Sequence, residues 1–125
     1  MPWHVKYLDD LQIILVKNSG VLDYNDYKQQ TIEARKLVKQ HKTHGTLVDD
    51  RELINNASEF DLIDMPDLYD ELKVNPKSRI AIWVSKEKSS HKQFLFFEEI
   101  CSKRGWQVKL FEDRSAAISW LKQPE

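Results

Sequence analysis

The sequence predicts an α/β fold: a mixed open sheet of about five strands with about four helices and an antiparallel first strand. Two observations predict it. From Asp23 onward, short apolar runs alternate with longer segments of helical periodicity, and strands separated by helices pair in parallel through right-handed crossovers. Before Asp23, two apolar runs are separated only by a tight turn, which makes that pair antiparallel. The expected order is β-β-α-β-α-β-α-β-α.

The N-terminal strand pair is expected over residues 5–8 and 11–17. Asp9 and Asp10 suit the turn, because a short carboxylate side chain bonds the local backbone. Residues 13–16 (Ile-Ile-Leu-Val) show no alternation, which indicates a strand covered on both faces. The Asn-Ser-Gly run at 18–20 is expected to end this strand.

A helix is expected from a cap at Asp23 to about residue 41, and Gly45 follows it. Its inward stripe has steps of three, four or seven residues and consists of Tyr24, Tyr27, Thr31, Ala34, Leu37 and Val38. Residues 46–48 then form a short central strand.

The C-terminal half contains a buried strand at 79–84 and a half-exposed strand at 107–111. Between them, Ser89 or Ser90 caps a helix that ends at Gly105. The core stripe of this helix is Phe94, Phe97, Ile100 and Cys101. Asp113 caps a last helix, whose inward residues are Ala116, Ala117, Trp120 and Leu121.

The segment from Asp49 to Leu72 is strongly acidic, with nine Asp or Glu residues against one base, Arg51. Pro66 is expected to stop any continuous helix and to begin a short one over about 66–73. Ser58 and the acid three residues later resemble a capping box.

The apolar residues of this segment do not fit one helical stripe, and they are our candidate binding residues: Phe60, Leu62, Ile63, Met65 and Leu68. They either line a groove or dimer contact, or simply cover the open face of the sheet.

Several sequence segments resemble those of the SpoIIAA-like family of small uncharacterised bacterial proteins, which is of the STAS type. Residues 11–22 resemble its opening, and the runs at 79–84, 94–98, 108–111 and 117–121 resemble its C-terminal third. The resemblance implies a β-α superhelical fold, with residues 1–125 as a single domain. It also implies a relationship to anti-sigma-factor antagonists and to Sec14-like lipid-binding modules.

The resemblance also suggests a phosphorylation site. STAS regulators carry an Asp-Ser pair, followed closely by Gly, and the Ser is phosphorylated. When residues are counted without gaps from Asp49, taken as the aspartate that ends the central strand, Ser58 falls at the phosphorylated position. The neighbouring residues differ from the family pattern: Ala57 stands in place of the aspartate, and Glu59 and Phe60 stand in place of the small residue and the glycine. The alternative is that Ser58 only caps a helix.

Each of the other candidate sites also has a simpler structural interpretation. Asp49 and Asp50 at the carboxyl end of a central strand could hold a magnesium ion, or could serve as turn and cap residues. His41 and His44 have a metal-ligand spacing, but helix C-termini also favour such side chains. Cys101 lies on an apolar stripe and is expected to be a buried thiol. We expect no catalytic residue, metal or cofactor.

The composition excludes several function classes. A net charge of −1 provides no electrostatic footprint for nucleic acid. The longest apolar runs are far below the ~20 residues of a membrane span, and the N-terminus lacks a signal-peptide pattern. A single cysteine agrees with the cytoplasm.

The leading hypothesis is therefore a non-enzymatic binding or regulatory module that acts through protein contact, with a protein partner or with itself as a homodimer. The alternative is a carrier of a small apolar or lipid-like ligand. The third reading is a magnesium-dependent enzyme that uses Asp49 and Asp50.

Overall fold

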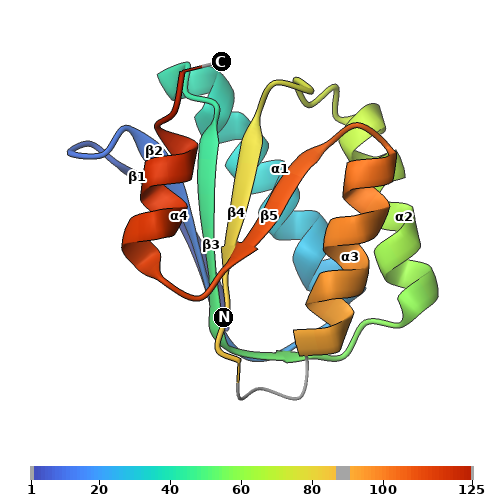
Figure 1. Ribbon diagram of the computed structural model, residues 1–125. Coiled ribbons are helices and arrows are strands. Elements are labelled where there is room, and N and C mark those ends of the chain that lie inside the picture. Colours follow the sequence, from blue (N-terminus) through green and yellow to red (C-terminus); the bar gives the residue numbers. More distant parts are fainter. Residues whose placement is uncertain (1, 87–90, 125) are drawn as a thin grey trace.

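The computed structural model describes residues 2–86 and 91–124 and contains one five-stranded sheet and four helices (Figure 1). The strands are β1 (Trp3–Leu8), β2 (Ile13–Leu22), β3 (Gly45–Asn55), β4 (Arg79–Trp83) and β5 (Gln107–Phe111). The helices are α1 (Tyr24–His41), α2 (Glu59–Glu71), α3 (His91–Lys103) and α4 (Arg114–Leu121). In the described residues, no helix is both long and apolar enough to cross a membrane.

The sheet has the order β1-β2-β3-β4-β5, with β1 antiparallel to β2 and every other pair parallel. The predicted mixed sheet and antiparallel first strand are confirmed. Helices α1, α2 and α3 pack on one face, and α4 packs on the other. Neighbouring strand residues divide between the faces: Leu47 and Ala81 pack against α4, whereas Val48 and Ile82 face the three-helix side.

The two central strands are longer than expected. β2 continues through Gly20, whose positive φ of 98° suits glycine, so the Asn-Ser-Gly run does not end it. β3 runs to Asn55 rather than ending near Val48, and Asp49 and Asp50 therefore lie inside the strand. The prediction that they lie at the carboxyl end of the strand was wrong. The run of four charged residues from Asp49 to Glu52 had indicated a turn, whereas the strand continues through it.

A β-bulge interrupts the pairing of β2 with β3. Lys17 pairs with Asp49 and Ser19 with Glu52, so that Asn18 faces both Asp50 and the residue after it. An extra residue of this kind changes which face the following side chains occupy. It is the reason that Asp50 and Leu53, three residues apart, both face α1.

Helix α2 is continuous, and the predicted stop at Pro66 was wrong. Proline inside a helix removes one backbone hydrogen bond. Here its ring is fully buried, and Leu62, Met65 and Tyr69 form an apolar stripe beside it, so packing outweighs that loss. The capping box of Ser58 with Asp61 is present as predicted, with Ser58 Oγ accepting from Asp61 N at 3.1 Å.

The remaining helices follow the predicted pattern with two exceptions, Ala116 and Ile100, the second of which is only half-buried although it was expected in the core stripe of α3. Phe94, Phe97 and Cys101 are buried in α3, and Asp113 caps α4. The expected caps at Ser89 and Ser90 lie outside the described residues. Ala116 is exposed rather than inward-facing, because α4 turns Ala117, Ile118 and Leu121 toward the sheet instead.

Helix α1 begins at the predicted cap, with a reciprocal capping box between Asp23 and Asp26. Its inward stripe is only half-buried, from Tyr24 to Val38. The one buried residue of the helix is polar, Gln30. An amphipathic helix normally buries its apolar stripe against the core. In this protein, the space beneath α1 is incompletely filled.

Candidate ligand cavity

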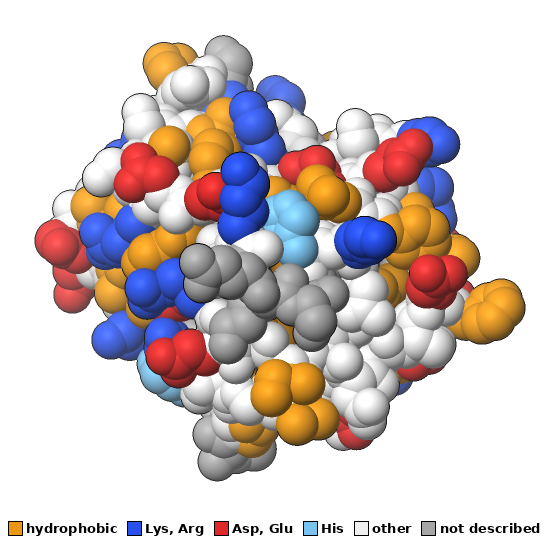
Figure 2. All heavy atoms as spheres, turned by 60° about the horizontal axis from the view of Figure 1, so that its bottom comes forward, with side chains coloured by type: hydrophobic (Ala, Val, Ile, Leu, Met, Phe, Trp, Pro, Cys, Tyr) orange, Lys and Arg blue, Asp and Glu red, His pale blue; other side chains and the backbone are white. Residues whose placement is uncertain are grey.

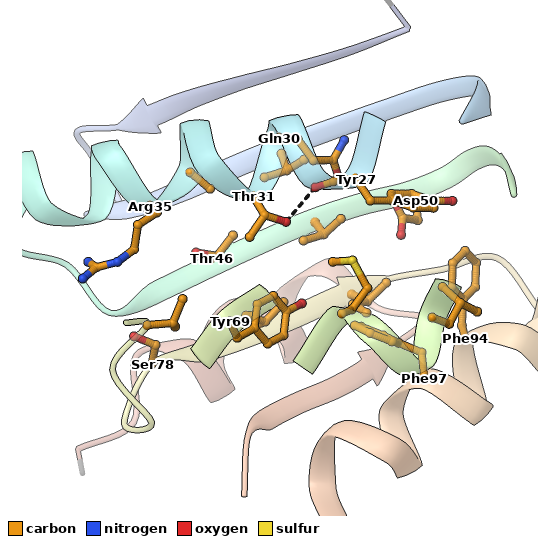
Figure 3. Close-up of a pocket in the computed structure, with 18 of the residues that line it drawn as sticks. Tyr27, Gln30, Thr31, Arg35, Thr46, Asp50, Tyr69, Ser78, Phe94 and Phe97 are labelled. Carbon is orange, nitrogen blue, oxygen red and sulfur yellow. Dashed lines mark hydrogen bonds between the residues drawn. The ribbon is translucent and has the colours of Figure 1, made fainter. Parts of the chain in front are cut away.

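A cavity of about 130 Å³ lies between α1, the sheet and the helix pair α2–α3. Figure 3 shows the labelled side chains of α1 on one side of this space and those of α2 and α3 on the other. The apolar lining from α1 is small, Ala34 and Val38, whereas α2 and α3 contribute Met65, Phe94 and Phe97. The short side chains of α1 leave the volume open.

The sheet floor of the cavity is apolar for most of its length. Val16, Val48, Ile80 and Ile82 come from the three central strands, all on the face toward α1. Aliphatic side chains on this floor can contact a ligand only by dispersion and by excluding water.

One end of the cavity is polar, and its groups come from β2, β3 and α1, where Asn18 lies beside Asp50 at the bulge. Asn18 Nδ2 donates to Asp50 Oδ1 at 2.7 Å, and Asn18 and Gln30 exchange hydrogen bonds at 2.9 and 3.2 Å. All three side chains are buried, and Gln30 and Asp50 line the cavity. We call Asn18, Gln30 and Asp50 the amide–carboxyl cluster.

Asp50 has an unusual environment for a carboxyl group. Burial, together with a smaller effect of the charge of Asp49, raises its pKa to about 7 against the opposing hydrogen bond from Asn18. Within the described residues, no cation bonds this carboxyl group. Asp50 therefore changes its charge near neutral pH.

A second set of polar groups joins three elements beside this cluster. The Tyr27 hydroxyl donates to Asn55 Oδ1 at 2.7 Å, and Asn55 Nδ2 donates to Gln93 Oε1 at 2.9 Å. Asn55 also holds the turn into α2 through both backbone groups of Ala57. Burial, and then the charge of Asp50, raises the pKa of Tyr27, which keeps its hydroxyl protonated.

The opposite end of the cavity contains Arg35, Asn75 and Ser78. The Arg35 guanidinium donates to the carbonyls of Leu72 and Lys73, both at 2.9 Å, and so ties α1 to the end of α2. The buried Ser78 Oγ has no hydrogen-bond partner among the described residues. A buried hydroxyl without a partner is uncommon and suits a polar group of a ligand.

On the other face of the sheet, Asp49 is fully paired. It accepts from Lys17 Nζ at 2.9 Å and from Arg51 Nε and Nη2 at 2.9 and 3.0 Å. Arg51 also stacks on Trp83, 3.5 Å from the ring centre. Although burial raises the pKa of Asp49, these bonds together outweigh it and hold the pKa below its usual range.

Asp49 and Asp50 thus point to opposite faces of β3, so the two carboxylates cannot bind one magnesium ion. In the part of the chain that the structure describes, no group of three or more His, Cys, Asp or Glu residues could hold a metal. His41 instead stacks on Tyr7, with ring centres 3.8 Å apart. Cys101 is buried as predicted, and burial raises the pKa of its thiol to about 12.

The five candidate binding residues of the acidic segment separate into two groups. Leu62, Met65 and Leu68 are buried, and the first two line the cavity. Phe60 is 82% exposed and Ile63 is 43% exposed. Ser58 is the N-cap of α2 and lies in the short connection between β3 and α2. Its phosphorylation stays a prediction.

The large exposed apolar residues of the described chain belong to segments near the carboxyl end of the parallel strands: Val21, Ile54, Phe60, Ile63 and Leu95. Val21 and Ile54 are paired at the ends of β2 and β3, and the other three lie in the first turns of α2 and α3. Figure 2 turns this end forward, and orange hydrophobic side chains alternate there with charged ones. Phe60 and Ile63, three residues apart on α2, lie on one face of that helix, and we call these two residues the carboxyl-end patch.

Sequence reasoning missed the amide–carboxyl cluster. One signal was available: Gln30 lies between Tyr27 and Ala34 on the inward stripe of α1, at a position where an apolar residue was expected. The other members had no such signal, because Asn18 and Asp50 come together only through the pairing of β2 with β3.

No family model matches this chain, and no curated protein matches it. Eight chains among solved structures do match. One is an uncharacterised protein of the DUF3478 family with a SpoIIAA-like fold from Shewanella loihica PV-4. It has 24% sequence identity and a TM-score of 0.63, and the match covers 95% of this chain and 91% of that one.

A second match is the anti-sigma factor antagonist SpoIIAA in its unphosphorylated form. It has 11% identity and a TM-score of 0.60, over 98% of this chain and 99% of that one. The predicted SpoIIAA-like fold is confirmed. At these identities the matches show the fold, and a fold alone does not specify function.

Proposed function

We propose that this protein is a non-enzymatic binding module whose cavity holds a small, mostly apolar ligand. The observation that supports it is the cavity of about 130 Å³, with apolar walls and a few polar groups at its ends. Ligand sites have this composition, although most are larger. An engineered cavity of about 150 Å³ holds benzene, so a single ring or a short alkyl chain is the expected size.

The packing of α1 supports the same proposal. Protein interiors are close-packed, with few voids larger than a water molecule. In this chain Tyr27, Thr31, Ala34 and Val38 point inward from α1 and yet stay half-buried around the open space. A ligand in the cavity would complete their burial and stabilise the protein through mass action.

A titration with benzene, followed by NMR, tests this proposal. Benzene should shift the resonances of Val48, Met65 and Phe94 in the wild-type protein. Ala34→Leu fills the cavity and should abolish these shifts, whereas the same substitution at exposed Ala116 should keep them. If benzene shifts none of these resonances, or shifts them equally in Ala34→Leu, the cavity is not a ligand site.

A second candidate function, contact with a protein partner, is favoured by the carboxyl-end patch. Phe60 and Ile63 project from the first turns of α2 next to Glu59, Asp61 and Asp64. Apolar side chains in an acidic surround fit a protein whose contact surface is apolar with a basic rim. The structural match to an anti-sigma factor antagonist agrees with a role in protein contact, which we place in the cytoplasm.

Affinity capture at low and high salt tests this candidate, with Phe60→Asp compared with Gln29→Asp on an exposed position of α1. A partner with basic surface residues should be captured by the wild type and by Gln29→Asp, lost with Phe60→Asp, and weakened by salt. Size-exclusion chromatography distinguishes a homodimer from a complex with another protein. If the wild type is a dimer and Phe60→Asp is a monomer, the partner is a second copy of this chain. Equal capture by both variants would contradict the role of the patch.

A further inference from the structure

The polar end of the cavity has a carboxyl group with no cation to pair with. Asp50 is 5% exposed, and one of its oxygens accepts the amide of Asn18. Asn18 and Gln30 otherwise satisfy each other. An ionised carboxylate that is buried without a counter-charge is costly, and an opposite charge brought into contact with it offsets that cost.

The basic residues around this part of the sheet are committed elsewhere. Lys17 and Arg51 bond Asp49 on the opposite face. Arg35 lines the far end of the cavity, where its guanidinium is held by two backbone carbonyls. The counter-charge for Asp50 is therefore not supplied by these three side chains.

We propose that the cavity binds a small apolar amine, whose ammonium group pairs with the carboxylate of Asp50 while its alkyl or aryl part lies on the apolar floor. This inference rests on the proposed ligand-binding function and names the ligand class. Asn18 and Gln30 position the carboxyl group and do not themselves bind the amine. Ligands with a carboxylate or phosphate at this end would be repelled by Asp50.

The surroundings of Asp50 give this pairing a pH dependence. The charged group that acts on it is Asp49, across the sheet, and α1 presents the neutral hydroxyl of Tyr27. The other groups beside Asp50 are neutral: Asn18 from β2, and Gln93 and Phe94 from α3. Since burial raises the pKa of Asp50 to about 7, the ionised form becomes dominant between pH 6 and 8. The affinity for an alkylammonium ion should rise about tenfold over this range.

Butylamine and butan-1-ol form a matched pair of probes, and titration calorimetry at pH 6 and pH 8 compares them. The wild type should bind butylamine about tenfold more tightly at pH 8, whereas the affinity for butan-1-ol should not change. Asp50→Asn should lose the preference for the amine and keep the alcohol. Asp49→Asn, on the opposite face, should keep the preference.

A second measurement uses only the wild type, so it does not depend on how Asp50→Asn folds. The NMR titration of the Asp50 carboxyl carbon should show a lower pKa with butylamine present and no change with butan-1-ol. If butan-1-ol binds and butylamine shows neither the pH dependence nor this pKa change, the amine inference is wrong and the cavity stands. If neither probe binds, the proposed function itself fails.

Discussion

Two consecutive residues of β3, Asp49 and Asp50, have opposite environments on the two faces of the sheet. Asp49, beneath α4, accepts bonds from Lys17 and Arg51, and its pKa is lowered. Asp50, beneath α1, is bonded by an amide and has a raised pKa. Strand alternation separates the two carboxyl groups, and the helices on each side decide which one is paired.

The two faces of the sheet also differ in how completely the side chains at their centre are buried. Leu47, Ala81 and Ala117 are completely buried where α4 meets the sheet. On the α1 side, Val48 and Ile80 are half-buried at the floor of the cavity. At these positions the α4 face is close-packed, whereas the α1 face retains space and an unpaired carboxyl group for a ligand. Four predictions test this contrast.

The largest effect is expected from truncation on the closed face. Leu47→Ala should lower the free energy of unfolding by about 3–5 kcal/mol, because it removes a completely buried side chain and leaves a void. Ile80→Ala, on the cavity floor, should cost only about 1–2 kcal/mol, since part of its surface is already exposed. Urea denaturation measures both, and equal losses would remove the packing difference between the faces.

The next effect is a pH dependence of opposite sign at the two carboxyl groups. The raised pKa of Asp50 means that the folded protein holds its proton up to about pH 7, whereas the unfolded chain releases it near pH 4. The free energy of unfolding should therefore fall between about pH 4 and 7. Asp50→Asn should lack this fall, which amounts to about 2–4 kcal/mol.

Asp49 provides the contrasting control in the same denaturation experiment. Because its pKa is lowered, its contribution to stability is present above about pH 4 and is lost as the pH falls through the folded pKa. Asp49→Asn should flatten the acid side of the profile and leave the change between pH 4 and 7 intact. The contrast fails if both substitutions alter the same pH range.

A smaller effect is expected at the hydroxyl that joins α1 to β3. Tyr27→Phe removes the bond to Asn55 and should cost about 1 kcal/mol in the free energy of unfolding. Tyr24→Phe, three residues earlier on the same helix, should cost less than about 0.5 kcal/mol. Thermal unfolding compares the two, and a larger loss at Tyr24 would show that the Tyr27 bond does not hold α1 in place.

The smallest effect is expected for the exposed partner of Asp49. Arg51→Ala should cost less than about 1 kcal/mol, because its guanidinium is partly in water and Lys17 still pairs with the carboxylate. Added salt should reduce the difference from the wild type. A loss above about 2 kcal/mol in chemical denaturation would mean that the cation–π contact with Trp83 contributes more than an exposed pair.

The order of elements and the strand pairing could be predicted because they depend on local signals. Asp23 and Asp113 cap helices as their positions in the sequence suggest, and the turn at Asp9 and Asp10 makes the first pair antiparallel. Helix α2 could not be predicted in this way. The cost of Pro66 is local, whereas the burial of Leu62 and Tyr69 that offsets it depends on α3 and the sheet.

The candidate site was predictable only in part. Leu62 and Met65 were identified as candidate binding residues, and the structure places both in the cavity lining. The cavity itself depends on how far α1 lies from α2, which no periodicity encodes. Asp50 was interpreted as a turn residue because the pairing that keeps it within β3 comes from β2, more than thirty residues earlier.

The bulge opposite Asn18 has a consequence for how related sequences should be aligned. The bulge absorbs one extra residue of β3, so that Asp50, Leu53 and Asn55 all face α1. A homologue that lacks one residue between Asp49 and Leu53 would pair the two strands without a bulge, and regular alternation would still turn the counterparts of Leu53 and Asn55 toward α1. A single-residue gap at this point is therefore compatible with the polar end of the cavity, and the flanking residues should be aligned across it.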